Sequence, residues 1–501
     1  MHRLPQLVLD RTGGVALSAQ LVTQLRDLVL TGMIGTGERV PGSRALAQQL
    51  GVARSVVVAA YEQLLGEGFF EATAGSGTRV AAGPVLPVAR GRGRPPAEPV
   101  RAEASAPESE AIDLVSGRPY AGAEPPRDWR RAQAVAARLP LRSDPPDPQG
   151  DPRLRAELAR HAERARGIRC GPEDVLITAG TSEALLLIAL AMRSLADPLD
   201  PEAEPGAAPV IAVENPGYPT AHEVLRAAGA RVRHVAVGSE GLTAERLAAS
   251  VRERGRVDAA LVTPSHQYPL GGRLGAAQRL ALLDWAEREG AVLLEDDYDS
   301  EYRYAGALLP AIASLDSGAR VLHIGSLNKT LSPSVRCGYL VLPGDGELRR
   351  ALWRVRAGLG ATVSAATQAA LAEFLASGGY RRYVARTRRE YRHRRAAVLE
   401  TLGGLLPAAR LSALDGGLHA VLELHPEISA ERVQSGLARR GVRIETVADL
   451  SAGPSGAHNA LVIGYGAESI LRLRQALGEV VAEIRGRADL RQIVISENID
   501  A

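Results

Sequence analysis

The chain has 501 residues, more than a single hydrophobic core supports, so two or more domains are expected. Apolar residues make up 46% and charged residues 23% of the chain, which excludes a disordered or fibrous protein, and a net charge of +3 does not by itself indicate nucleic-acid binding. Two cysteines are too few for a disulfide framework or a metal cluster, so we expect reduced thiols and no metal site.

Neither the N-terminal residues nor the apolar runs of the sequence predict export or insertion into a membrane. The residues that follow Met1 lack the unbroken apolar stretch of a secretory signal. The longest apolar runs, such as 184–192, are too short to span a bilayer. We therefore expect a soluble cytoplasmic protein that does not enter a membrane.

Residues 1–82 are predicted to contain a winged-helix DNA-binding domain. Ser18 is a candidate N-cap of the first helix, Gly32 a stop signal, and Gly51 part of a tight turn between the second and third helices. Glycines in the tip of the hairpin allow it to approach a DNA groove closely. The first helix is expected between Ser18 and Gly32, and the other helices and strands cover residues 44–50, 54–66, 69–72 and 78–80.

The third predicted helix is expected to read DNA. Arg54 at its start is placed for a major-groove base edge or a phosphate, and Arg44 for the DNA backbone. The alternative is a small helical domain used for dimerisation. The full set of predicted DNA contacts is Ser43, Arg44, Arg54, Ser55, Gly77 and Arg79.

Three segments of this region, 39–47, 50–54 and 59–64, resemble the GntR family of winged-helix regulators in order and spacing. The resemblance implies binding to double-stranded operator DNA. Val56 and Ala74 depart from the family pattern, which usually has a polar residue and an arginine at these places.

The composition changes after this domain. Residues 83–111 are rich in Pro, Gly, Ala, Arg and Glu, which predicts a linker without a core. Residues 112–485 alternate apolar strand-like runs with amphipathic helical stretches, which predicts an α/β domain with a mostly parallel sheet, and residues 486–501 a loosely held tail. The strand candidates are Val210–Val213, Ala259–Thr263, Ala291–Glu295, Val321–Ile324 and Gly338–Leu342.

Lys329 is the only lysine in the sequence, and it follows the strand candidate 321–324. A chain that otherwise uses arginine is expected to keep a lysine where an amine must condense with an aldehyde. Another strand candidate ends near Asp296 and Tyr298, so an amine, a carboxylate and a phenol can converge at the sheet edge. A pyridine aldehyde cofactor requires this set of groups.

The second part of the chain resembles aminotransferase-like proteins of fold type I. Together with the winged helix it resembles the MocR/GabR regulators, which implies a small C-terminal α+β subdomain, a homodimer and bound pyridoxal 5'-phosphate. The segments that carry the resemblance are 177–184, 213–219, 263–269, 295–301 and 325–329.

The resemblance also implies residue roles. Lys329 would bind the aldehyde, Asp296 the pyridine nitrogen, Tyr298 the ring oxygen, and Tyr218 would lie near the ring face. His266 has a weaker case and could be a supporting histidine. The phosphate would be held by Thr181, Ser182, Ser326 and Arg336.

At some positions the residues differ from those expected in an active aminotransferase. The arginine expected to grip a substrate carboxylate is missing from Leu461–Tyr465, although Arg443 or Arg472 could reach the site from elsewhere. Asn328 replaces a serine, and Pro145 stands where relatives often have a tyrosine.

These departures predict a regulator rather than an enzyme, with no certain catalytic residue. Pyridoxal phosphate, or an amino compound that joins it, would act as the effector and change operator binding. The alternatives are an active aminotransferase with an accessory DNA-binding domain and a DNA-binding protein that only stores the cofactor.

Overall fold

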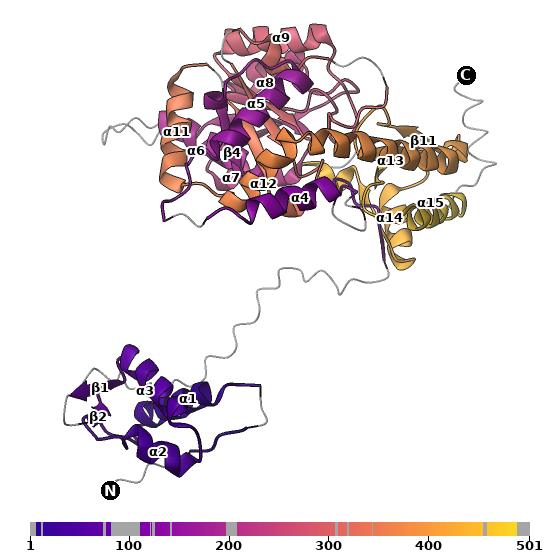
Figure 1. The fold of residues 1–501 in the computed structure, drawn as a ribbon. Coiled ribbons are helices and arrows are strands. Elements are labelled where there is room, and N and C mark those ends of the chain that lie inside the picture. The colour runs from indigo at the N-terminus through magenta and orange to yellow at the C-terminus, as the bar shows by residue number, and fades with distance from the viewer. Residues whose placement is uncertain are drawn as a thin grey trace, which may run out of the picture. The chain divides into compact units, whose positions relative to one another are not determined.

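The computed structural model divides the chain into two compact units, Met1–Pro107 and Glu108–Ala501 (Figure 1). The described residues are 7–11, 14–73, 77–81, 111–120, 122, 126–140, 143–196, 208–305, 309–317, 320–342, 344–453 and 458–487. The predicted linker, apart from Ala111, and nearly all of the predicted tail lie outside these residues. No helix among them is long and apolar enough to cross a membrane.

The first unit is a three-helix domain with a β-hairpin, as the sequence predicts. Its core consists of leucine and valine side chains that recur at helical spacing, among them the fully buried Leu21, Leu25, Val57 and Leu64. The elements are α1 (Leu17–Leu30), α2 (Ser43–Leu50), α3 (Arg54–Gly66), β1 (Phe70–Thr73) and β2 (Gly77–Val80).

The ends of these helices confirm the two glycine signals and correct one capping prediction. Gly51 ends α2 in the left-handed conformation with φ of 62°, and Gly32 follows α1 with φ of 72°. Ser18 is not the N-cap of α1, because the helix already begins at Leu17. Ala16 occupies the cap position and makes no side-chain hydrogen bond, so the local capping signal did not set the first residue of this helix.

The second unit contains a seven-stranded sheet in the order β4-β10-β9-β8-β7-β5-β6. Only β10 runs antiparallel to its neighbours, so the sheet is mostly parallel. All five strand candidates are confirmed. The strands are β4 (Val175–Thr178), β5 (Val210–Asn215), β6 (Arg231–Ala236), β7 (Ala259–Val262), β8 (Val292–Asp297), β9 (Val321–Ser326) and β10 (Gly338–Val341).

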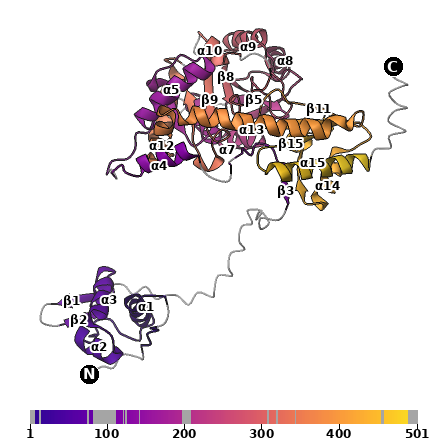
Figure 2. The ribbon, with the colours of Figure 1, turned by 45° about the vertical axis from the view of Figure 1, so that its right-hand side comes forward.

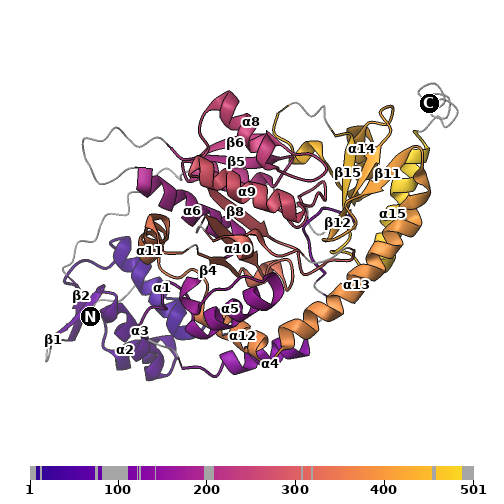
Figure 3. The same ribbon diagram turned by 90° about the horizontal axis from the view of Figure 1, so that it is seen from above.

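Helices cover both faces of this sheet because successive strand residues point to opposite sides. Ile211 and Leu294 pack with helices on one face, while Ala212 and Leu293 pack on the other. Figure 3 shows the strands of this sheet together with the helices around them. The first face carries α6 (Thr181–Ala196), α7 (Pro219–Ala227) and α11 (Glu347–Leu359). The second carries α8 (Ala244–Arg254), α9 (Ala276–Glu289) and α10 (Ile312–Leu315).

A further cluster beside β4 and β10 is formed by α4 (Arg127–Ala136), α5 (Pro152–Arg166) and α12 (Ala365–Ala376). The long helix α13 (Gly379–Leu402) runs from α4 and α12 to the C-terminal subdomain (Figure 2). It therefore links the two subdomains with one rigid element.

The C-terminal subdomain has α+β architecture, as the family resemblance implies. Its four-stranded sheet has the order β11-β12-β15-β14, and β13 pairs with β3 in a separate parallel pair. The elements are β3 (Ile112–Asp113), β11 (Ala409–Ser412), β12 (His419–Leu424), α14 (Ala430–Arg439), β13 (Val442–Arg443), β14 (Glu445–Thr446), β15 (Ala460–Gly464) and α15 (Ile470–Arg485).

Candidate functional site

A cavity of about 520 Å³ lies at one edge of the seven-stranded sheet. The strands β4, β5, β7, β8 and β9 run parallel, so their carboxyl ends meet at the same edge, where ligands bind in open α/β sheets. The residues predicted to hold the cofactor come from these strand ends. All eight of them line this cavity: Thr181, Ser182, Tyr218, Asp296, Tyr298, Ser326, Lys329 and Arg336.

The Lys329 amine points into the cavity from the loop after β9. It donates a hydrogen bond to the carbonyl oxygen of Gly117, a glycine with φ of 75°. A Cβ atom at Gly117 would lie 2.8 Å from the amine, so a side chain here would displace the end of Lys329, and the positive φ also favours glycine. Burial lowers the pKa of Lys329 against the attraction of nearby carboxylates, which favours the neutral, nucleophilic amine.

Asp296 is the least satisfied polar group of the cavity wall. It lies in β8, is 6% exposed, and its Oδ1 atom has no hydrogen-bond partner among the described residues. Burial, together with the carboxylates of Asp297 and Glu214, raises the pKa of Asp296 to about 8. An unpaired buried carboxyl is costly, and a protonated ring nitrogen would supply the missing partner. The site therefore fits pyridoxal phosphate.

Asparagine in place of Asp296 is expected to stabilise the cofactor-free protein and to weaken its binding of pyridoxal phosphate. Between pH 4 and pH 8 the folded chain keeps a proton on Asp296 that the unfolded chain has lost, so the stability of the wild type falls as pH rises. The variant has no ionisable group at this position and does not lose this stability. At pH 8 we expect its free energy of unfolding to exceed that of the wild type by roughly 1–3 kcal/mol.

Urea unfolding from pH 5 to pH 8 and equilibrium binding of pyridoxal phosphate measure the two effects of Asp296→Asn. A variant that is less stable than the wild type at pH 8, or that binds pyridoxal phosphate equally well, would contradict this role of Asp296.

The predicted phosphate ligands line the cavity from three places in the chain. Thr181 and Ser182 form the N-terminus of the 16-residue helix α6, where unpaired backbone N–H groups attract anions. Ser326 ends β9, and Arg336 has φ of 49° before β10. Asn328 has a supporting role here, because its Oδ1 atom accepts a hydrogen bond of 3.1 Å from the Cys337 amide.

Tyr218 and Tyr298 line the cavity, and His266 contacts the Tyr298 hydroxyl. The Tyr298 hydroxyl donates to the His266 carbonyl oxygen at 3.0 Å, and His266 Nδ1 lies 2.8 Å from Asp299 Oδ2. Burial alone would lower the pKa of His266, but the Asp299 carboxylate outweighs it and raises that pKa. His266 thus supports Tyr298 rather than lining the cavity. Tyr218 is 39% exposed and meets Tyr268 edge to face.

No arginine other than Arg336 lines the cavity within the part of the chain that the structure describes. Arg443 pairs with Asp113, and Arg472 lies 2.7 Å from Glu468. Both arginines are thus held outside the cavity wall. The family-typical position for a carboxylate-binding arginine lies in β15, where the residues are apolar and buried.

Sequence reasoning missed several residues of the cavity wall. The backbone at Gly117 is at the cavity because the chain turns there, and the order Gly117-Arg118-Pro119 was a turn signal. Tyr268 lies in the segment 263–269, which carries the family resemblance and could have indicated it. The other residues have no recognisable pattern, because segments far apart in the sequence bring them together; they are Ser116, His419 and Glu445.

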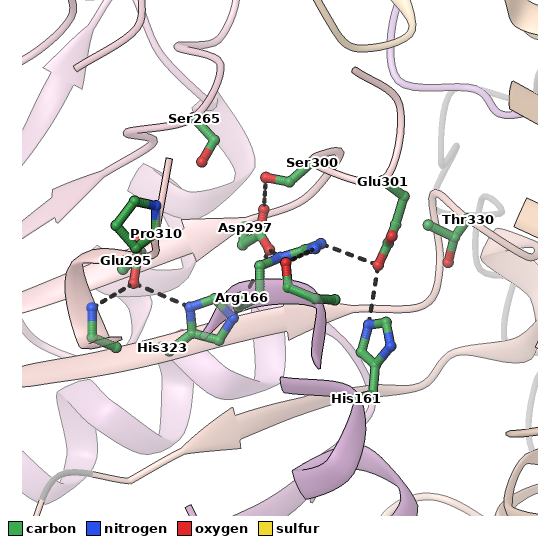
Figure 4. A network of polar contacts seen from close by, with 12 residues as sticks. His161, Arg166, Ser265, Glu295, Asp297, Ser300, Glu301, Pro310, His323 and Thr330 are labelled. Atoms are coloured by element: carbon green, nitrogen blue, oxygen red, sulfur yellow. Dashed lines mark hydrogen bonds and ion pairs between the residues drawn. The ribbon is translucent and has the colours of Figure 1, made fainter. Parts of the chain in front are cut away.

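A buried charged network lies behind the cavity (Figure 4). Its centre is Arg166, which binds Asp297 and also Glu301, the latter at 3.1 Å. His161 reaches the same Glu301 carboxylate at 3.0 Å, and His323 Nδ1 lies 3.1 Å from Glu295. Burial would raise the pKa of Asp297 and Glu301, but Arg166 together with the neighbouring His323 and His161 outweighs it, and both pKa values are lowered. The network anchors β8, the strand that carries Asp296.

The predicted DNA contacts lie on the exposed side of the first unit. Arg44, Arg54 and Ser55 are exposed at the starts of α2 and α3, and Arg54 Nε donates to Ser43 Oγ at 3.2 Å. Arg79 differs, because its guanidinium is partly buried and donates to the Gly37 carbonyl oxygen at 3.1 Å.

The remaining prediction concerns the wing. Gly77 is exposed with φ of 83°, as a hairpin tip requires. The neighbouring Gly75 and Ser76, which complete the predicted tip, lie outside the described residues.

Comparison with known proteins matches both units. Residues 17–80 match the family model of bacterial regulatory proteins of the gntR family, and residues 109–449 match aminotransferase class I and II. The solved structure of LysN, the alpha-aminoadipate aminotransferase of Thermus thermophilus, is 26% identical, with a TM-score of 0.64 over 75% of this chain and 92% of its own.

Two regulators are similar to this chain over most of its length. The HTH-type pyridoxine biosynthesis transcriptional regulator PdxR of Corynebacterium glutamicum is 38% identical over 93% of this chain and 95% of its own length. A Rhizobium meliloti protein named "Probable rhizopine catabolism regulatory protein MocR" is 36% identical over 77% of each chain. The chain belongs to the MocR/GabR-type family, whose members join a GntR-type helix-turn-helix domain to an aminotransferase class I and II domain.

Proposed function

We propose that this protein is a cytoplasmic transcription regulator that binds operator DNA and uses its aminotransferase-like unit to sense pyridoxal 5'-phosphate. One observation carries the proposal: the eight predicted cofactor residues line a single cavity that also contains a buried, unpartnered carboxyl oxygen. Membership of a family of helix-turn-helix regulators supports the DNA-binding half of the proposal.

Each of these cavity residues would bind a different part of the cofactor. The cofactor supplies an aldehyde for covalent attachment and a ring that withdraws electrons. Lys329 supplies the amine, and burial keeps it reactive. Asp296 holds the proton on the ring nitrogen, while Arg336 and the first turn of α6 bind the phosphate. The Tyr298 hydroxyl would bind the ring oxygen by giving up the hydrogen bond that it donates to the His266 carbonyl oxygen.

We infer that the site acts as a sensor rather than as an aminotransferase. Substrate turnover requires a cation that grips the α-carboxylate, and Arg336 is already assigned to the phosphate. The effector is pyridoxal phosphate itself or its combination with an amino compound. PdxR, a regulator named for pyridoxine biosynthesis, is a similar protein, which favours the first of these. We further propose a homodimer, since paired recognition helices suit paired half-sites.

Alanine in place of Arg54 is expected to weaken operator binding by about 1–3 kcal/mol, because an exposed arginine at the start of the recognition helix contacts a base edge or a phosphate. Fluorescence anisotropy with labelled operator DNA measures the loss. Arg26→Ala is the matched control, since the Arg26 guanidinium in α1 pairs with Glu67 and not with the predicted DNA face. Equal losses in both variants would contradict the assignment.

Operator binding measured with and without pyridoxal phosphate tests the proposal as a whole. We expect the cofactor to change the affinity about 5-fold or more, in either direction. An unchanged affinity with bound cofactor would support a storage protein. Steady turnover of amino donors with 2-oxo acids would instead support an active aminotransferase.

A further inference from the structure

The wall of the cavity next to Lys329 carries a carboxylate that faces the ligand space. Glu445 lines the cavity from the short strand β14. It forms no ion pair in the part of the chain that the structure describes, and its negative charge acts on the Lys329 amine and on the Tyr268 hydroxyl. An unneutralised carboxylate in a ligand cavity influences which charged ligands can enter.

The position of Glu445 in the sheet adds to this observation. β14 and β15 are antiparallel, and Glu445 is paired directly with Val462. Directly opposed residues of an antiparallel pair place their side chains on the same face. Val462 lies in the apolar segment from which the carboxylate-binding arginine is missing, and it packs in one cluster with Tyr268 and Leu450, which line the cavity. A negative charge therefore stands beside the place where a positive one is expected.

Glu445 also occupies hydrogen-bond donors of the cavity wall. Its Oε2 atom accepts hydrogen bonds from the Ser116 amide at 3.0 Å and from the Ser116 hydroxyl at 2.7 Å. The Ser116 oxygen lies 2.6 Å from the Tyr268 hydroxyl, which must be the donor because the serine proton is used on Glu445. A ligand carboxylate would find these donors taken and a like charge beside them.

Two arginines line the adjoining cavity of about 890 Å³, but both are engaged. Arg394 is 1% exposed and donates to the carbonyl oxygens of Tyr465 and Glu468. Arg118 forms an ion pair with Asp113. Neither arginine forms an ion pair with Glu445 in the part of the chain that the structure describes, and each is paired with another group instead.

We propose that Glu445 is a specificity-determining residue that excludes amino acids from the site and restricts any amino effector to amines without a carboxylate next to the amine. The proposal rests on the function proposed above, because it assumes that Lys329 and the cavity hold pyridoxal phosphate. The selection is electrostatic, because the Glu445 carboxylate repels the carboxylate of a ligand. Glu445 also occupies the hydrogen-bond donors that would otherwise bind the ligand carboxylate.

L-Alanine and L-alaninamide test the proposal, because they have nearly the same shape and differ in the charge of one group. Calorimetric titration of each into the full-length protein loaded with pyridoxal phosphate gives the two affinities. We expect the wild type to bind the amide at least about tenfold more tightly. In Glu445→Gln, which keeps the shape of the side chain but removes its charge, this preference should fall at least about fivefold. The two amines differ in basicity, but this difference affects both proteins equally. Comparing the preference of the wild type with that of Glu445→Gln therefore removes its effect.

Asp449→Asn is the matched control. Asp449 also lines the cavity and its substitution removes the same charge, but the carboxylates that act on the Lys329 amine are those of Asp296, Asp299 and Glu445. The preference should stay at the wild-type value in this variant.

The outcomes separate this inference from the proposed function. A protein that takes up no pyridoxal phosphate overturns both. A loaded wild type that binds the acid as well as the amide, or binds neither, overturns the role of Glu445 alone. The same holds if Glu445→Gln, loaded with cofactor and folded by circular dichroism, keeps the full preference.

Discussion

Alanine in place of Lys329 is expected to abolish covalent uptake of pyridoxal phosphate and every effect of the cofactor on operator binding. The chain has no other lysine, so no second ε-amine can replace it. The DNA-binding unit is a separate compact body, and we expect operator affinity without the cofactor to stay unchanged. Anisotropy titrations should show a response of about 5- to 150-fold in the wild type and none in the variant.

Lys329→Arg is the control for charge in this experiment. A guanidinium keeps the positive charge but does not condense with an aldehyde, so this variant should behave like the alanine variant. An operator response to pyridoxal phosphate that persists in both variants would show that the cofactor acts elsewhere. A response lost in alanine but kept in arginine would assign the switch to charge rather than to the covalent bond.

Alanine in place of Arg166 is expected to destabilise the protein by about 3–5 kcal/mol, because it leaves the buried carboxylates of Asp297 and Glu301 without their cation. Urea unfolding followed by circular dichroism measures the loss. Arg382→Ala is the matched control, since Arg382 and Asp128 form an exposed ion pair, which typically contributes less than about 1 kcal/mol.

The Arg166 prediction includes a pH dependence. The pKa values of Asp297 and Glu301 are lowered in the folded protein, so their contribution to stability is present above the unfolded-state value near 4 and is lost as pH falls below it. Without Arg166, burial raises the pKa values of both carboxyl groups relative to the wild type. The stability difference between wild type and variant should therefore be largest near pH 7 and shrink toward pH 4. A difference that is constant with pH would contradict the electrostatic explanation.

Most of the fold could be predicted from the sequence where apolar periodicity is local and strong. The bounds of α3 and the central strands followed from such patterns. The strand β6 (Arg231–Ala236) was not predicted, because it is an edge strand whose residues are mostly half-exposed or exposed. It therefore lacks an apolar run. The start of α1 was misjudged because packing of Leu21 and Leu25, rather than a cap, holds that helix in place.

The candidate site was predictable only in part, for a physical reason. Lys329 and Asp296 were found because each follows or ends a strand, and strand ends of a parallel sheet meet at one edge. Glu445 belongs to a strand of two residues and meets Ser116 across 329 positions of the sequence, so no local pattern indicates it. The partners of Arg166 were hidden in the same way, since they depend on how α5 packs against β8.

Borohydride reduction of the wild-type protein after incubation with pyridoxal phosphate, followed by peptide mass spectrometry, tests the central claim most directly. The claim is that the buried amine of Lys329 holds this cofactor in the cavity at the sheet edge. We expect the peptide that contains Lys329 to gain the mass of one reduced pyridoxyl phosphate group and no other peptide to change. An unmodified Lys329 peptide in protein that is folded and saturated with the aldehyde would contradict the account.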